Sequence, residues 1–99
     1  MTEFAHFLDE DRRLVILKAL AAADQFRLNQ HLLQSFCASL GHSVSGDKVR
    51  TDLAWLTEQG LIKTEQVLDV TIATLTRRGA DVADGRARAP GVKRPLPGE

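Results

Sequence analysis

The sequence predicts a mainly α-helical domain with one small β-hairpin, and three observations lead to this fold class. Apolar residues recur at helical spacing in three segments between residues 9 and 60. Two short runs rich in β-branched residues follow directly, at residues 61–66 and 70–75. A last short helical segment comes next. We therefore expect a three-helix core, a two-stranded hairpin and a C-terminal helix within residues 1–85.

The first helix is expected from Asp9 to Ala23, because acidic residues occupy its first turn and apolar residues follow at helical spacing. The sequence leaves open whether residues 2–8 extend this helix or form a separate arm. The second helix is expected to begin after Asn29, a good N-cap, and to end near Gly41. Its apolar residues form one continuous face, made of Leu32, Leu33, Phe36, Cys37 and Leu40.

The third helix is expected between Ser45, a good N-cap, and Gly60. Its buried side would carry Val49, Leu53 and Leu56. Two helices of this length joined by a few residues match the plan of a helix-turn-helix unit. The two expected strands follow the second of these helices directly, which is the position of the wing in a winged helix-turn-helix domain. Residues 67–69 would form the turn of the hairpin.

The last expected helix runs from Arg77 to Asp84 and is capped by Thr76. Residues 86–99 are predicted to be an extended basic tail, because the prolines and glycines there do not support regular structure. Six basic and three acidic residues give residues 70–99 a charge of +3, whereas the whole chain of 99 residues is neutral. This asymmetry favours an acidic partner for the tail.

Two stretches of the chain resemble winged-helix regulators, of which ArsR-like repressors are the nearest broad group. The run SGDKVRTDLAWLTEQGLI, residues 45–62, resembles the recognition helix and first wing strand. The run ATLTRRGADVA, residues 73–83, resembles the second wing strand and the closing helix. The chain as a whole, with its ending PGVKRP at residues 90–95, is similar to small winged-helix proteins of Mu-like bacteriophages and prophages. This resemblance implies a phage origin and a bacterial cytoplasm.

The expected function follows from the way a helix-turn-helix unit meets DNA, with the exposed N-terminal residues of its second helix in the major groove. Arg50 is suited to pairing with guanine, and Lys48 to guanine or a phosphate. The expected contacts in this helix are Ser45, Asp47, Lys48, Arg50 and Thr51. The tail would add phosphate contacts through Arg86, Arg88, Lys93 and Arg94. We therefore expect a sequence-specific transcription regulator that binds double-stranded DNA as a homodimer.

The acidic residues of the third helix leave an alternative open, a winged-helix module that binds protein and no DNA. Asp47 and Asp52 would oppose DNA phosphates, and Lys63 is the only cation of the expected wing. Val67 and Leu68 make the tip of the wing apolar. In this interpretation the third helix is a solvated surface with ion pairs such as Lys48–Asp52, and the tail only improves solubility.

Isolated aromatic and thiol residues have structural interpretations. Cys37 lies within an apolar helical face and is expected to be a buried thiol, since a lone cysteine forms no internal disulfide. Trp55 is expected to pack between the third helix and a neighbouring element. A dimer contact is the rival interpretation for Trp55, and it applies to Phe4 and Phe7 as well.

No motif in the sequence predicts catalysis or a bound group. The histidines are scattered without ligand spacing, at His6, His31 and His42. A cysteine pair or His–Cys cluster is missing too, so the metal sensing of ArsR-like proteins is not carried over. No apolar run approaches the roughly 18 residues that a membrane span requires. We expect a cytoplasmic, non-enzymatic protein without a cofactor, metal or small-molecule ligand.

Overall fold

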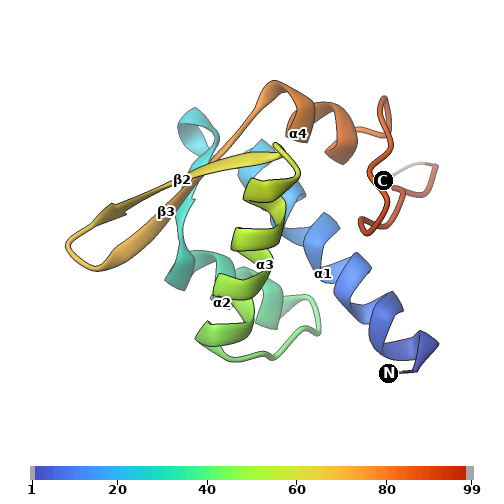
Figure 1. Cartoon of the computed structure of the whole chain (residues 1–99), viewed down its shortest axis with the longest axis horizontal. Coiled ribbons are helices and arrows are strands. Elements are labelled where there is room, and N and C mark those ends of the chain that lie inside the picture. Colours follow the sequence, from blue (N-terminus) through green and yellow to red (C-terminus); the bar gives the residue numbers. More distant parts are fainter. Residues whose placement is uncertain (1, 98–99) are drawn as a thin grey trace.

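The computed structural model describes residues 2–97 as a small α+β domain (Figure 1). Its described part contains four α-helices, one 3-10 helix and a three-stranded antiparallel sheet. The elements in chain order are α1 Glu3–Ala22, η1 Asp24–Phe26, β1 Arg27–Asn29, α2 Gln30–Ser39, α3 Gly46–Glu58, β2 Ile62–Val67, β3 Val70–Leu75 and α4 Arg77–Ala83. Within this part of the chain, no helix is both long and apolar enough to cross a bilayer.

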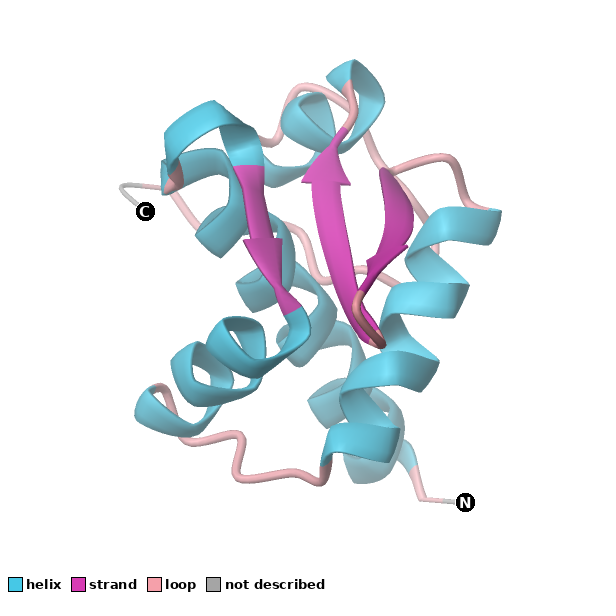
Figure 2. Ribbon diagram, turned by 90° about the vertical axis from the view of Figure 1, so that its left-hand side faces the viewer, coloured by secondary structure: helices cyan, strands magenta, loops and turns pink. Residues whose placement is uncertain are grey.

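The sheet has three strands where the sequence predicted a two-stranded hairpin, so the expectation of a hairpin alone was wrong. The strand order is β1-β3-β2, and β3 pairs antiparallel with both neighbours (Figure 2). Ala73 of β3 lies opposite Leu28 of β1 and opposite Thr64 of β2. An ion pair of 2.8 Å between Arg27 and Glu65 joins the two outer strands across β3. A three-residue strand is too short to show alternation, which is why the sequence did not reveal β1.

The turn between β2 and β3 is tighter than predicted. Val67 pairs with Val70, so only Leu68 and Asp69 form the loop. Both have left-handed backbones, with φ of 50° and 67°. A two-residue hairpin loop with this geometry usually contains Asn and Gly, which the sequence lacks here. Strands β2 and β3 form a two-stranded ribbon that projects beyond the rest of the sheet into solvent (Figure 1). The Leu68 side chain at its tip is 93% exposed.

Helix α1 decides between the two alternatives that the sequence left open for residues 2–8. Residues 3–8 belong to it, because the Thr2 hydroxyl accepts a hydrogen bond of 3.2 Å from the Ala5 amide and caps the first turn. At 20 residues, the helix is about 30 Å long. Its buried side chains begin only at Arg12. The first turns therefore project past the other elements in Figure 1.

The other helix boundaries confirm the predicted caps. The side chain of Asn29 accepts from the Leu32 amide at 2.9 Å, that of Ser45 from Lys48 at 3.1 Å, and that of Thr76 from Gly79 at 3.0 Å. Gly41 and Gly60 follow α2 and α3 with φ of 95° and 74°, as expected of glycines that end helices.

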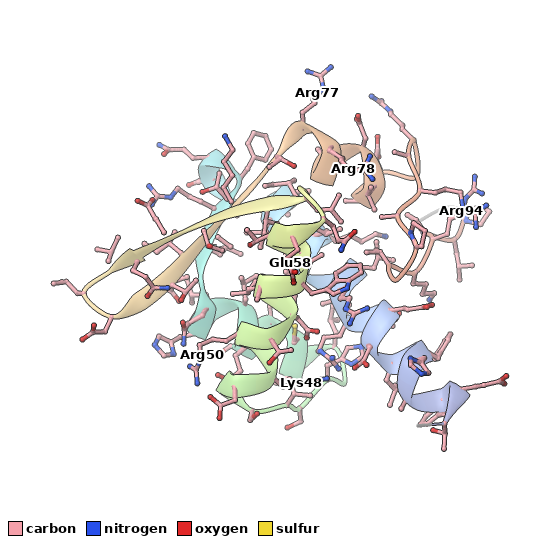
Figure 3. The ribbon with its side chains drawn as sticks, in the orientation of Figure 1. Lys48, Arg50, Glu58, Arg77, Arg78 and Arg94 are labelled. Carbon is pink, nitrogen blue, oxygen red and sulfur yellow. The ribbon has the colours of Figure 1, made fainter. Side chains whose placement is uncertain are left out.

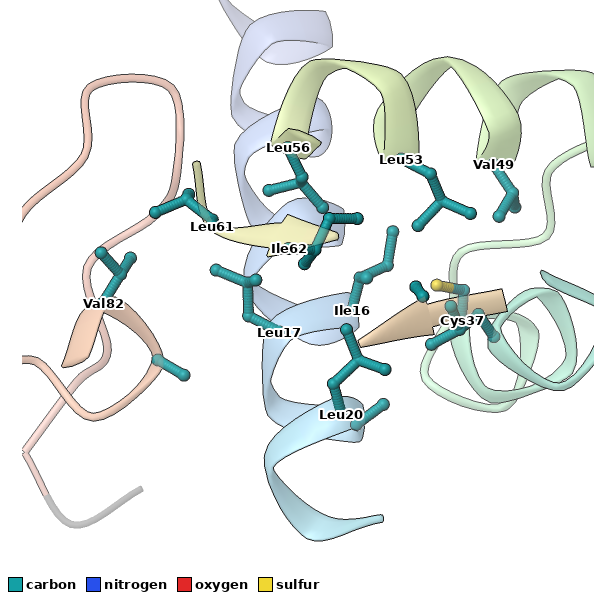
Figure 4. Packing of buried hydrophobic residues seen from close by; sticks show 14 of the residues in the cluster. Ile16, Leu17, Leu20, Cys37, Val49, Leu53, Leu56, Leu61, Ile62 and Val82 are labelled. Carbon is teal, nitrogen blue, oxygen red and sulfur yellow. The ribbon is translucent and has the colours of Figure 1, made fainter. Parts of the chain in front are cut away.

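The core lies where α1, α2, α3 and α4 meet the sheet (Figure 4). Its largest fully buried apolar side chains are Ile16, Leu17, Leu20, Leu33, Leu53, Leu56, Leu61 and Ile62. Gly79 lets α4 approach this core closely, since a Cβ there would collide with the Leu61 carbonyl oxygen and lie 2.7 Å from Leu75 Cδ1. The predicted burial of Val49, Leu53 and Leu56 on α3 is confirmed.

Residues 86–97, the described part of the predicted tail, contain no helix or strand and lie against α1 and α3. Arg13 donates a hydrogen bond of 2.9 Å to the Gly91 carbonyl, and the Lys93 amide donates one of 3.1 Å to the Glu10 carbonyl. Ala89 is buried. The segment is therefore packed against the domain and does not extend away from it.

Candidate nucleic-acid interface

Helix α3 presents a polar surface opposite its apolar one. Val49, Leu53 and Leu56 are buried, which fixes the helix on the core. The opening turn begins at Ser45, whose hydroxyl is used for capping. The side chains that remain exposed in this helix are Asp47, Arg50, Thr51 and Ala54 in its first turns and Thr57 and Glu58 at its end. The predicted contact residues of α3 are thus together on one helix, and most of them are accessible.

Arg50 and Asp47 form an exposed ion pair one turn apart, with guanidinium Nη2 against carboxylate Oδ1. Thr51 lies beside them, and its hydroxyl donates to the Asp47 carbonyl at 3.0 Å. Figure 3 shows Arg50 on the side of α3 toward which the β2–β3 ribbon extends. One accessible surface therefore carries the Arg50 guanidinium, the Asp47 carboxylate and the Thr51 hydroxyl.

Lys48 has a partner within the fold. Its Nζ lies 3.3 Å from Oδ1 of Asp9, and the same oxygen accepts a hydrogen bond of 2.6 Å from Arg12. Burial alone would raise the pKa of Asp9, but the hydrogen bonds from Arg12 and Lys48 outweigh burial and lower it. Lys48 therefore ties the first turn of α3 to α1.

Asp52 lies beneath the surface, where Arg12 neutralises it. The two side chains are 1% and 3% exposed, and Arg12 Nε lies 2.5 Å from Asp52 Oδ2. The predicted ion pair between Lys48 and Asp52 is therefore wrong, because Asp52 points inward from α3 and Lys48 toward α1. A buried carboxylate without a cationic partner strongly destabilises a fold, and Arg12 is the partner of Asp52. The negative charge of Asp52 is consequently absent from the exposed surface of α3.

Sequence reasoning missed Arg12. A signal for it exists, because Arg12 precedes Ile16 and Leu20 at spacings of four on the buried side of α1. Its partner is 40 residues away, so local patterns do not identify the pair.

The cations of the tail are placed apart from Arg50. Arg86 pairs with Asp84 at 3.0 Å, and Lys93 Nζ lies 3.3 Å from Asp11. Arg88 and Arg94 are exposed and form no ion pair within residues 2–97. In Figure 3, Arg94 and Arg50 lie on opposite sides of α1 and α3. The structure thus brings together the predicted contacts of α3 but not those of the tail.

Comparison with known proteins gives a relative at high identity. No family model matches the chain. The uncharacterized protein gp26 of Escherichia phage Mu is 49% identical over 90 residues, which cover 91% of this chain and 93% of gp26. The chain belongs to the gp26 family. An uncharacterized protein of Haemophilus influenzae is 37% identical over 76 residues, covering 76% of this chain and 74% of that protein. The phage origin implied by the resemblance is thereby supported.

In this gp26-family protein, the C-terminal segment is linked to α1 and to the α2–α3 loop by one polar cluster. His42 is 7% exposed, and its Nε2 lies 2.6 Å from Asp11 Oδ2, while Lys93 contacts the other carboxylate oxygen. Burial would raise the pKa of Asp11, but the hydrogen bonds from His42 and Lys93 lower it below its ordinary value. No group of three or more potential metal-ligating side chains occurs among the described residues of the gp26-family chain.

The predictions for Trp55 and Cys37 as packed residues are confirmed in the gp26-family protein. Trp55 is partly buried, and the Arg13 guanidinium lies 4.1 Å from its ring centroid, within cation–π range. Cys37 is completely buried, and burial raises the pKa of its thiol to about 11. Neither Cys37 nor Trp55 is therefore a candidate functional residue. The candidate site is the exposed surface of α3.

Proposed function

We propose that this gp26-family protein is a winged helix-turn-helix regulator that binds double-stranded DNA through the opening turns of α3, in the bacterial cytoplasm and without catalysis. One observation supports this most directly. The apolar side of α3 is buried, while Asp47, Arg50 and Thr51 at its N-terminal end are uncovered. This is the end of the recognition helix that reads base edges in helix-turn-helix proteins.

The order of elements supports the same proposal. Helices α2 and α3 are joined by residues 40–45, and the ribbon β2–β3 follows α3 directly, as a wing does. Arg50 lies on the side of α3 from which this ribbon extends, so the helix and the ribbon can approach one duplex together (Figure 3).

The chemistry of the Arg50–Asp47 pair suits a G·C base pair. The guanidinium can donate two hydrogen bonds to guanine O6 and N7, and the carboxylate can accept from the cytosine amino group. Their mutual ion pair holds both side chains over the same helical turn. Lys48 forms an ion pair with Asp9, so it would contribute to DNA binding chiefly by positioning this turn.

Selection from a pool of random duplexes, followed by fluorescence anisotropy on the enriched sequence, tests the proposal. We expect enrichment of sites that contain G·C pairs at fixed positions. Affinity should fall with salt, with a slope in log K of about −0.9 for each phosphate contacted. A pool that stays random, together with no binding at low salt, would contradict DNA recognition.

Exposed apolar side chains favour a second candidate function, the binding of another phage protein. Leu68 is 93% exposed at the tip of the ribbon. Helix α2, which contains no charged residue, exposes Leu32 and Phe36, and Leu40 is exposed directly after it. Protein interfaces are enriched in such uncharged apolar surfaces. Capture of one stoichiometric phage protein by the native chain, and its loss with Leu68→Asn, would favour this function.

A further inference from the structure

The first turns of α1 form an amphipathic arm that lies largely outside the core. Phe4, Phe7 and Leu8 are 68%, 51% and 37% exposed and lie on one side of the helix. Glu3 carries an unpaired negative charge within residues 2–97. The cap at Thr2 makes the arm part of a continuous helix, so Phe4 cannot fold back onto its own domain.

A cavity of about 700 Å³ lies at the base of this arm, between α1, the end of α4 and residues 87–95. Its apolar lining includes Phe7, Val82 and Val92. Arg88 and Arg94 contribute to the lining and have no ionic partner within residues 2–97. The third cation, Lys93, is held by Asp11 and lies 5.9 Å from the Phe7 ring centroid. Glu10 also contributes to the lining, so the cavity is partly apolar and partly polar, and its two unpaired arginines give it a net positive charge.

The arm and the cavity are complementary in both polarity and charge. Phe4, accompanied by the free carboxylate of Glu3, matches a partly apolar cavity bordered by free guanidinium groups. Both surfaces belong to one chain and adjoin at Phe7. A two-fold axis near Phe7 would therefore place the arm of each copy against the cavity of the other, as in an isologous interface.

We infer that a second copy of this chain docks here, with Phe4 of each arm in the cavity of the partner copy and the Glu3 carboxylate beside Arg88 and Arg94. The homodimer forms without DNA, so the inference stands apart from the proposed function. A monomer that binds DNA would overturn the dimer alone, and a dimer that binds no DNA would overturn the function alone.

Sedimentation equilibrium of the full chain over a range of concentrations tests the dimer. The native chain should sediment as a dimer at micromolar concentrations. Phe4→Ala should raise the dissociation constant by about tenfold or more, as expected for a central aromatic contact. Phe26→Ala is the matched control, since Phe26 is 54% exposed on η1, and it should leave the constant unchanged.

Charge reversal checks the complementarity independently of packing. Arg88→Glu with Arg94→Glu should weaken the dimer, and adding Glu3→Arg should restore part of the loss. Circular dichroism would verify that each variant is folded. A monomeric native chain, equal effects of Phe4→Ala and Phe26→Ala, or a dimer dissociated only by Phe36→Ala on α2 would overturn the inference.

Discussion

Arg12 of α1 and Asp52 of α3 form a nearly inaccessible ion pair, with 2.5 Å between Arg12 Nε and Asp52 Oδ2. The pair sets the position of α3 relative to α1, and Asp9 and Lys48 extend it to the surface. The helix that carries the candidate interface is therefore held by polar contacts on one side and by the apolar core on the other.

Asp52→Asn should destabilise the protein by about 3 kcal/mol, because removal of one partner leaves the Arg12 charge buried and undercompensated. Urea denaturation followed by circular dichroism measures this. Asp47→Asn, which breaks an exposed pair, should change the free energy of unfolding by less than about 1 kcal/mol. The double variant Arg12→Met with Asp52→Leu should lose less than Asp52→Asn. Equal losses for Asp47→Asn and Asp52→Asn would contradict this role of the pair.

Gly79→Ala should destabilise the fold by about 3 kcal/mol, because its Cβ would meet the Leu61 carbonyl and force α4 from the core. Thermal or urea unfolding measures the loss. Gly46→Ala is the matched control at the start of α3, where the nearest atoms are 3.5 and 3.6 Å from the added Cβ. That change should leave stability within about 0.5 kcal/mol or raise it. A Gly79→Ala variant as stable as the native chain would show that α4 packs differently.

Replacing the Leu68–Asp69 turn by Asn–Gly should stabilise the protein by about 1 kcal/mol, because both positions have positive φ and leucine tolerates it poorly. Leu68→Ala removes the exposed side chain but keeps a strained residue, so it should change stability little. If Leu68→Ala alone gave the whole gain in a denaturation series, backbone strain would not be the cause.

Much of the helical framework follows from the sequence, because caps and apolar spacing are local. Asn29, Ser45 and Thr76 are N-caps as predicted, and each acts on an amide three residues away. Features that depend on distant partners were missed. Strand β1 exists through its pairing with β3, and Arg12 in α1 gives no sign of a carboxylate 40 residues later.

The candidate site was predicted in part for the same reason. Arg50 and Asp47 lie on one helix, so their proximity follows from helical spacing. Lys48 pairs with Asp9 of α1, and Lys93 with Asp11, through tertiary contacts that spacing does not encode. Whether a charged side chain is free for a partner therefore depended on the fold.

Cys37 should make the protein less stable at high pH. Burial raises the pKa of this thiol from 9.0 to about 11, so the unfolded chain loses the proton first. Stability should fall as pH rises above about 9 and the loss should level off above about 11, with a total of about 3 kcal/mol. Cys37→Ala should remove this part of the slope in a pH series of urea denaturations. Identical slopes for the two proteins would exclude the thiol as the cause.

The claim that α3 reads DNA is tested most directly by paired arginine variants. Arg50→Ala and Arg77→Ala each remove one exposed guanidinium, and Figure 3 places Arg77 at the start of α4, away from Arg50. In anisotropy titrations with the selected duplex, Arg50→Ala should weaken binding by roughly tenfold and relax the preference for G·C. Arg77→Ala should leave both nearly unchanged. Equal affinities for the two variants, or loss only with Arg77→Ala, would contradict recognition through α3.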